Sequence, residues 1–347
     1  MNSEMPKVRN NIIAFTKNGA VVAQKLGEVL DNSLIYGMDS FVHEFEIHPL
    51  SGSLKKWVED RFVKGGRLIF VGSVGIAVRS IAPFVRSKTT DPAVLVVDEK
   101  GGYVIPILSG HIGGANDFAK EVAEILDATA VITTATDLNN VFSVDSWAEK
   151  SGYHIVNPDQ IKHISADLLS GKNVGVCSEF DILDPLPDGV VDSLTTESGF
   201  VIGDDPEPVY RNSLLLIPKR FVLGIGCRKN IDEAIFENVL LDFLDENKIN
   251  IDAICKIVSV DIKSEEKAIL DFSKKYDIRF MTFTPDQLDK VDGEFDSSDF
   301  VKKTVGVGNV CERASSLAGD RVIIKKQKLG GVTAALSVLN WGVKFDF

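Results

Sequence analysis

The segment from residue 108 to residue 117 concentrates polar groups among glycines. Within it, Ser109, His111 and Asn116 supply a hydroxyl, an imidazole and a carboxamide, with three glycines between them. Imidazole titrates near neutral pH, and neighbouring glycines leave it accessible, as acid–base catalysis requires. We therefore predict that His111 is an acid–base group; a histidine with only a structural role is the alternative. A serine nucleophile is disfavoured, because no G-x-S-x-G motif surrounds Ser109.

Three further glycine-rich loops follow predicted strands, at residues 72–75, 224–228 and 306–312. In a parallel sheet, ligands bind beyond the carboxyl ends of the strands, where helix N-termini offer N–H groups to anions. We predict this placement for all four loops, with a tight turn as the alternative for residues 224–228. Nucleotide binding is weakly supported, because Lys229 stands where G-x-G-x-x-G needs its third glycine and no P-loop motif occurs.

Two cysteines in the C-terminal third follow such loops. Cys227 and Cys311 have Arg228 and Arg313 nearby. A thiol beside a guanidinium and a helix N-terminus is typical of a nucleophile with a depressed pKa, but cysteine is more often a small buried side chain, and we favour the second interpretation. No H-E-x-x-H motif and no cysteine–histidine cluster predicts a metal site.

The acidic composition narrows the classes of partner. The chain has 347 residues, with 50 acidic and 38 basic side chains and a formal charge of −12, which disfavours binding to nucleic acid or an anionic membrane. Its four cysteines include no C-x-x-C pair, as expected of reduced thiols. The N-terminus lacks the apolar stretch of a signal peptide, and no segment approaches about 20 consecutive apolar residues. We expect a cytoplasmic protein with no membrane partner.

Hydrophobic periodicity predicts an α/β fold, because short apolar strands alternate with helical patterns along the chain. We predict two mainly parallel three-layer αβα-type domains, residues 1–140 and 219–347, joined by a smaller α/β middle segment, residues 141–218. Between residues 181 and 210 the chain has eight acidic residues and no lysine or arginine. We interpret this stretch as a solvated excursion before a domain boundary.

Local signals place several elements. The predicted strands include Arg67–Val71, Arg279–Phe283 and a hairpin formed by Ala93–Val97 with residues 103–107. A helix is predicted to open at Asn230, with Glu233 three residues later as in a capping box. Another is predicted after Thr284, with Pro285 in its first turn.

Several longer segments carry a family resemblance. They span residues 66–79, 91–98 and 108–116 in the N-terminal part, and residues 224–228, 306–314 and 326–333 in the C-terminal part. With these segments in this order, the chain resembles the cobalt-precorrin-5A hydrolase family (CbiG) of the anaerobic cobalamin pathway essentially from end to end. The middle segment matches only loosely.

The resemblance implies a reaction and its participants. The δ-lactone of a cobalt-corrinoid, cobalt-precorrin-5A, is hydrolysed with loss of acetaldehyde to give cobalt-precorrin-5B, and water is the co-substrate. The substrate carries the cobalt, so neither a metal site nor an organic cofactor is implied. A homodimer, and transfer of the intermediate from other cobalamin-pathway enzymes, stay open.

Such chemistry needs a base, donors for an oxyanion and cations for the carboxylates of the macrocycle. The predicted catalytic residues are His111, Ser109 and Asn116, with the N–H groups of Gly113 and Gly114 joining Ser109 as oxyanion donors. Arg79, Arg228 and Lys325 are predicted to pair with carboxylates. The full set of predicted substrate-binding residues is Gly72, Ser73, Gly75, Arg79, Gly113, Gly114, Gly226, Cys227, Arg228, Asn309, Glu312 and Lys325.

Two other classes of function remain. A non-catalytic tetrapyrrole-binding or carrier protein is the main alternative, because the C-terminal part by itself offers loops for a macrocycle. A nucleotide-dependent dehydrogenase is disfavoured by the missing third glycine.

Overall fold

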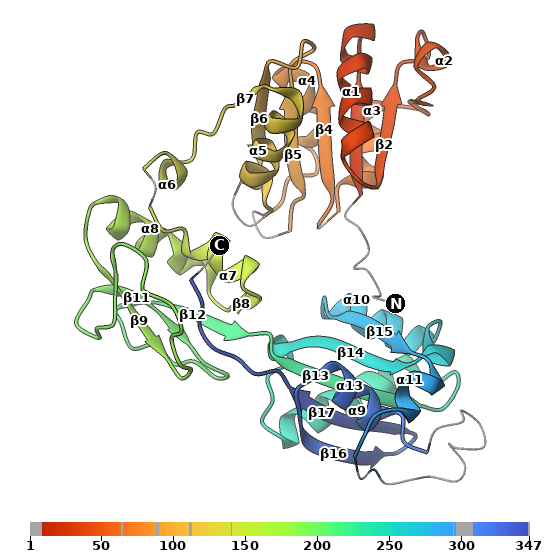
Figure 1. Cartoon of the computed structure of the whole chain (residues 1–347), viewed down its shortest axis with the longest axis vertical. Coiled ribbons are helices and arrows are strands. Elements are labelled where there is room, and N and C mark those ends of the chain that lie inside the picture. The colour runs from red at the N-terminus through yellow and green to blue at the C-terminus, as the bar shows by residue number, and fades with distance from the viewer. Residues whose placement is uncertain are drawn as a thin grey trace. The chain divides into compact units, whose positions relative to one another are not determined.

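The computed structural model describes residues 9–63, 65–87, 90–110, 113–139, 141–293, 295 and 308–345. The chain forms two compact units, residues 1–146 and 147–347 (Figure 1). The first unit holds one β-sheet and the second holds two. The predicted α/β class is confirmed, with parallel strand pairs in all three sheets. The domain boundaries at residues 140 and 218 stay a prediction.

The first unit is built on a seven-stranded sheet of order β3-β2-β1-β4-β5-β6-β7. The strands are β1 (Asn10–Ala14), β2 (Ser33–Gly37), β3 (His48–Pro49), β4 (Arg67–Val71), β5 (Ala93–Val97), β6 (Tyr103–Leu108) and β7 (Thr129–Ala130). All neighbours are parallel except β5 and β6. The predicted β4 strand and the predicted β5–β6 hairpin are therefore confirmed.

Helices cover both faces of this sheet, because alternate strand residues point to opposite sides. The helices of the unit are α1 (Lys17–Val29), α2 (Val42–Phe45), α3 (Leu54–Arg61), α4 (Val74–Ile81), α5 (Ala115–Leu126), α6 (Ala135–Leu138) and α7 (Val144–Lys150), which runs into the second unit. Ile12 and Leu95 are buried in one cluster with residues of α1 and α5. Ile13 and Phe70 are buried in another with residues of α3 and α4. Two apolar layers thus enclose the sheet in a three-layer arrangement.

The carboxyl end of β6 lies at the opposite edge of the sheet from the carboxyl ends of β1, β4 and β5. In the antiparallel pair, Val97 stands opposite Val104 and Val94 opposite Leu108. The segment after Leu108 therefore starts beside the beginning of β5. The prediction that residues 109–116 share the ligand-binding edge with residues 72–75 is wrong, because the hairpin reverses the direction of the chain.

The middle segment forms a sheet of order β10-β9-β11-β12-β8. Its strands are β8 (Tyr153–Ile155), β9 (Val174–Ser178), β10 (Val190–Val191), β11 (Ser198–Ile202) and β12 (Asn212–Pro218), and α8 (Ile161–Leu169) contacts β9, β11 and β12. The solvated excursion predicted for residues 181–210 is wrong, since it contains β11, a central strand with every residue buried. The acidic residues of this stretch lie in the turns on either side of it.

The Tyr210 ring leaves no room for a side chain at two glycines of this sheet. A Cβ at Gly175 or at Gly199 would lie 2.5 Å or 2.4 Å from the Tyr210 ring. The ring thus packs directly against the backbones of two neighbouring strands. Its hydroxyl donates to the Ser193 carbonyl oxygen at 3.2 Å.

The C-terminal sheet has the order β15-β14-β13-β17-β16. Its elements are β13 (Phe221–Cys227), α9 (Glu233–Glu246), β14 (Ile254–Val260), α10 (Lys267–Lys275), β15 (Arg279–Phe283), α11 (Pro285–Asp289), α13 (Cys311–Ala318), β16 (Arg321–Leu329) and β17 (Val332–Val338). The strands β13, β14 and β15 are parallel, whereas β17 is antiparallel to both of its neighbours. Residues of α9 and α10 are buried on one face, and residues of α11 and α13 on the other.

Three local predictions for this sheet have different outcomes. The helix after Thr284 is confirmed with Pro285 in its first turn, and the structure adds a capping box between Thr284 and Gln287 that was not predicted. The start of α9 at Asn230 is wrong, because the Asp232 side chain caps the helix by accepting from the Ile235 amide. The loop at residues 224–228 is also wrong, since residues 224–227 belong to β13. Gly224 is required there because a Cβ would lie 1.9 Å from the Cys311 carbonyl oxygen.

The buried strand β11 is tied to α8 by one charged hydrogen bond. Ser198, which is fully buried, donates to the Asp167 carboxylate at 2.6 Å. This hydrogen bond, opposed by burial and aided by Lys172, holds the pKa of the Asp167 carboxyl below its usual range. A carboxyl with a depressed folded-state pKa adds stability above its unfolded pKa, and that stability is lost as the pH falls through the folded pKa.

We expect Ser198→Ala to lower the free energy of unfolding by about 1 kcal/mol near neutral pH, the usual net value of a hydrogen bond. The difference in unfolding free energy between the variant and the unmodified protein should become smaller as Asp167 is protonated, because the charge that strengthens the hydrogen bond is then absent. Urea unfolding from neutral pH down to about pH 3 measures this. Ser170→Ala is the control, since the Ser170 hydroxyl donates to the backbone carbonyl of Asp167 and its cost should not follow that titration. A loss of unfolding free energy in Ser198→Ala that is constant with pH contradicts the expectation.

Candidate functional site

The carboxyl edge of the first sheet brings together the ends of β1, β4 and β5. The chain order reverses between β1 and β4, and open α/β sheets bind ligands at such a switch point. Gly72 follows β4 with no room for a side chain, because a Cβ would lie 2.9 Å from the Phe15 ring. Ser73 precedes α4 without capping it through its side chain. The exposed Arg79 guanidinium turns back to the Gly75 carbonyl oxygen at 3.4 Å.

Two residues at this edge were missed by the sequence analysis. The Thr16 hydroxyl donates to the Glu99 carboxylate at 3.0 Å and accepts from the Gly19 amide at 3.1 Å. These contacts link the end of β1 to the end of β5. The signal in the sequence was their position, since each polar residue follows closely on a strand that the apolar pattern predicts.

The turn that starts at Ser109 lies at the opposite edge. Ser109 has a positive φ of 59°, and its hydroxyl donates to the Asp91 carbonyl oxygen at 2.9 Å. Gly113 passes close to it, because a Cβ there would lie 2.3 Å from the Ser109 Cβ. A five-residue strand is about 16 Å long, so Ser109 and Gly72 belong to separate surfaces. His111 lies outside the described residues.

Asn116 fastens this turn to the start of α5. Its side chain is 4% exposed and donates to the Thr134 hydroxyl at 2.8 Å and to the Asp137 carboxylate at 2.9 Å. The backbone amides of Ala115 and Asn116 donate to the carbonyl oxygens of Ser109 and Gly110, each at 3.0 Å. Gly114 has the left-handed conformation and precedes the helix as its N-cap. Asn116 therefore positions the turn, and its catalytic assignment stays a prediction.

In the C-terminal sheet, the predicted residues meet where β13 ends and α13 begins. Asn309 is 1% exposed, and its amide donates to the Glu312 carboxylate at 3.0 Å. Glu312 is 3% exposed and also accepts from the Lys326 backbone amide at 3.2 Å. Thr333 donates to the Gly226 carbonyl oxygen at 3.3 Å. Asn309 and Glu312 thus join α13 to β16 from a buried position.

The predicted cations of this sheet are exposed. The Arg228 amide donates to the Gly331 carbonyl oxygen at 3.0 Å, and the Arg228 side chain lies over that glycine. Lys325 lies on the edge strand β16. Both side chains therefore face solvent, as a partner for a carboxylate must.

Comparisons with known proteins agree along the chain. Residues 56–137 match the family model described as Cobalamin synthesis G N-terminal, and residues 221–337 match Cobalamin synthesis G C-terminus. A cobalt-precorrin-5A hydrolase of Salmonella typhimurium is 31% identical over 94% of this chain and 97% of its own length. The chain belongs to the cobalt-precorrin-5A hydrolase family.

Further relatives of this hydrolase family extend the match. A cobalt-precorrin-5A hydrolase of Priestia megaterium is 29% identical over 94% of each chain. A solved structure of a cobalamin biosynthesis protein G homolog from Sulfolobus solfataricus covers 96% of this chain and 97% of its own, at 21% identity and a TM-score of 0.40. The N-terminal family model includes Gly72, Glu99 and the turn at Ser109 but not Thr16, and the middle segment lies outside both models.

Cys227 and Cys311 of this hydrolase-family chain do not have the chemistry of activated nucleophiles. Burial raises the pKa of the Cys227 thiol, against the opposing effect of the Lys263 ammonium. Burial also raises the pKa of Cys311 to about 11, although a hydrogen bond with Thr333 acts in the other direction. A raised pKa keeps the sulfur protonated near neutral pH, and the thiolate is the reactive form. The depressed-pKa alternative is therefore wrong for both cysteines.

Within the parts that the structure describes, no group of three or more histidine, cysteine, aspartate or glutamate side chains is arranged to hold a metal ion. In those same parts, no helix combines the length and the apolar character needed to cross a membrane.

We expect iodoacetamide to alkylate Cys311 at neutral pH at least about tenfold more slowly than N-acetylcysteine, because each unit of raised pKa removes about nine-tenths of the thiolate. Cys227 should also react more slowly than N-acetylcysteine, because burial raises its pKa. Mass spectrometry of peptides from the native protein measures the two rates separately. Labelling in denaturant is the control, since unfolding should remove the difference. Faster labelling of Cys227 than of the free thiol would reinstate it as a nucleophile.

Proposed function

We propose that this chain is the hydrolase that opens the δ-lactone of cobalt-precorrin-5A, releases acetaldehyde and yields cobalt-precorrin-5B. The likeness to cobalt-precorrin-5A hydrolases over nearly the full length of both chains carries this proposal, with 31% identity to the Salmonella typhimurium protein. Both matched family models support it, because they cover Gly72 and the turn at Ser109 in the first sheet and nearly all of the C-terminal sheet.

The proposed reaction has two balanced stages. Water adds to the lactone carbonyl and the ring ester C–O bond breaks, which leaves a carboxylate and a free hydroxyl. Deprotonation of that hydroxyl forms the C=O bond of acetaldehyde, while the C–C bond to the macrocycle breaks and its electron pair enters the conjugated ring. The protein needs to move protons, stabilise the oxyanion and hold the carboxylates of the substrate.

We assign these tasks to residues as follows. His111 is the acid–base group, and the N–H groups of Gly113 and Gly114 are the oxyanion donors. The Ser109 hydroxyl can join them only by leaving the Asp91 carbonyl oxygen. Asn116 holds the turn through Thr134 and Asp137, which is a positioning role.

Other predicted residues serve the substrate in this proposal. Arg228 and Lys325 are exposed cations of the C-terminal sheet and pair with carboxylates, and Arg79 does so at the carboxyl edge of the first sheet. The cobalt enters with the substrate, and no organic cofactor and no nucleic-acid partner is proposed. A homodimer and direct transfer from other pathway enzymes remain predictions.

The purified chain, given cobalt-precorrin-5A without oxygen, should release one acetaldehyde for each lactone opened. The aldehyde is trapped with a hydrazine and quantified, and mass spectrometry gives the mass of the corrinoid product. Solvent labelled with ¹⁸O should place one label in the new carboxylate, because water attacks the lactone carbonyl. Tight binding of the substrate with no acetaldehyde would instead support the non-catalytic carrier.

His111→Ala should lower kcat by about 10²-fold or more, the usual contribution of a general acid–base group. His43→Ala is the matched control, because His43 is an exposed histidine of the same unit, on α2. Stopped-flow absorbance of the corrinoid measures the rate in each variant. Undiminished turnover in His111→Ala, combined with loss of turnover in Glu99→Gln, would contradict the assignment of His111. It would indicate that the reaction takes place at the carboxyl edge, next to Thr16 and Glu99.

A further inference from the structure

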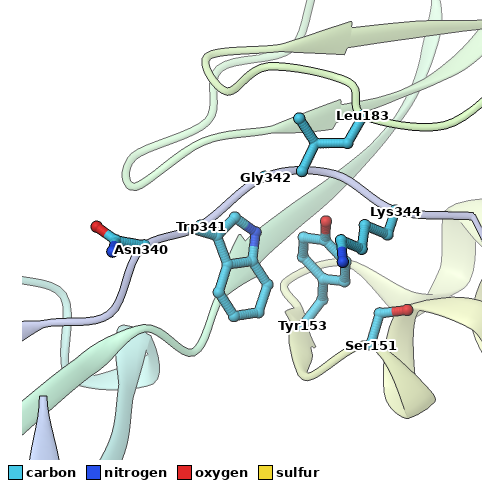
Figure 2. A pocket seen from close by; sticks show the side chains of 7 residues that line it. All are labelled: Ser151, Tyr153, Leu183, Asn340, Trp341, Gly342 and Lys344. Atoms are coloured by element: carbon cyan, nitrogen blue, oxygen red, sulfur yellow. The ribbon is translucent and has the colours of Figure 1, made fainter. Parts of the chain in front are cut away.

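A pocket of about 490 Å³ lies in the second unit, between the middle segment and the C-terminal tail, residues 340–345. Figure 2 shows the side chains that surround it. The middle segment contributes Ser151, Tyr153 and Leu183, and the tail contributes Asn340, Trp341, Gly342 and Lys344. None of these residues was predicted as a site residue, and they lie outside both matched family models.

The backbone of the tail is fixed where it forms the pocket. Val343 donates to the Asp181 carbonyl oxygen at 2.9 Å, and Leu183 donates to the Val343 carbonyl oxygen at 2.8 Å. The Phe345 ring stacks on the fully buried Trp147 at 4.8 Å between centroids. Trp147 in turn donates its indole N–H to the Lys344 carbonyl oxygen at 2.7 Å. Since the backbone on both sides of Lys344 is anchored, the pocket is formed before any ligand arrives.

The walls of the pocket combine aromatic rings with neutral polar groups. The Tyr153 and Trp341 rings meet edge to face at 5.5 Å. The Trp341 indole nitrogen is buried and forms no hydrogen bond of regular geometry among the residues that the structure describes. Burial raises the pKa of Tyr153 to about 12, and the Trp341 indole N–H beside the hydroxyl acts in the other direction. The Tyr153 hydroxyl and the Trp341 N–H are therefore neutral polar groups at the same wall.

Lys344 adds a positive charge to this aromatic wall. Its side chain is exposed, and within the described part of the chain no carboxylate forms an ion pair with it. The nearby Asp184 carboxylate already accepts from the Phe345 amide at 2.9 Å. In a chain with a formal charge of −12, an exposed ammonium beside two rings selects a ligand that is flat and anionic.

We propose that this pocket binds one edge of a corrinoid macrocycle, with a five-membered ring against Trp341 and Tyr153 and its carboxylate side chain on Lys344. The volume is in the range that holds a drug-sized group, which fits one edge of the macrocycle and excludes the whole of it. This proposal rests on the proposed function and extends it, because it gives the middle segment and the tail a share in substrate binding.

The test uses cobyrinic acid, a corrinoid with free carboxylates, and its heptamethyl ester as the uncharged probe. Lys344→Gln should weaken binding of the acid about tenfold and leave binding of the ester unchanged, because only the acid offers a charge to the ammonium. Trp341→Leu should weaken both probes about tenfold, because both stack on the ring. Isothermal titration calorimetry gives the dissociation constants. Lys162→Gln, an exposed lysine on α8 of the same unit, is the control.

The stability of the tail is checked separately from binding. Trp341→Phe retains a ring and loses the N–H, so its affinity should lie between those of the unmodified protein and Trp341→Leu. An unchanged melting temperature in Lys344→Gln excludes a folding defect as the cause of weaker binding. Affinity for the acid that is unchanged in either Lys344→Gln or Trp341→Leu overturns the proposal.

Turnover separates this proposal from the proposed function. In the acetaldehyde assay, Lys344→Gln should raise KM about tenfold with kcat nearly unchanged, as expected when a charge binds substrate and transition state equally. If the unmodified protein releases no acetaldehyde but the two variants lose affinity for cobyrinic acid, the pocket stands and the hydrolase assignment fails. If the protein turns over and KM does not change in the variants, the hydrolase stands and the pocket proposal fails.

Discussion

One carboxylate determines how the polar loops of the first unit are distributed. Asp98 follows β5 and accepts three backbone N–H groups in the turn that leads to β6, from Lys100 at 2.9 Å, Gly102 at 2.8 Å and Tyr103 at 2.6 Å. Gly101 supplies the positive φ of 72° that the turn needs. This turn sends β6 back along β5, and the chain that follows emerges at the far edge of the sheet. A crossover helix in place of the hairpin would have put the glycine-rich turn beside Gly72.

The sheet consequently has a candidate site at each of two opposite edges, whereas the sequence predicted both glycine-rich loops at the same edge. The carboxyl edge has the switch-point geometry and the Thr16–Glu99 pair, and the opposite edge has the turn held by Ser109 and Asn116. The two sets of residues serve different demands of the same chemistry, since a turn at a helix start offers N–H groups, whereas an exposed arginine beside a sheet edge offers charge. A macrocycle with several carboxylates has use for both kinds of surface.

Features that depend on neighbours in the sequence were predictable. The bounds of β4 and β15 agree with the apolar runs, and the helix after Thr284 has Pro285 in its first turn as predicted. Features that depend on distant packing were not predictable. Gly224 resembled a loop glycine but is needed because the Cys311 carbonyl approaches β13. Asn309 and Glu312 resembled exposed ligand groups, yet they are buried in contact with each other.

The acidic region before residue 210 shows why composition alone misled. The charge count indicates one solvated stretch over residues 181–210, whereas β11 within it ends in the apolar residues Phe200, Val201 and Ile202 and is buried throughout. The core of the middle segment is then completed from the far end of the chain, by Phe345 stacking on Trp147. Such a partner lies 198 positions away in sequence and leaves no local signal. Because the tail packs on the middle sheet, residues 147–218 obtain part of their core only after the C-terminal sheet has been synthesised, and the second unit is therefore one structural entity although it holds two sheets.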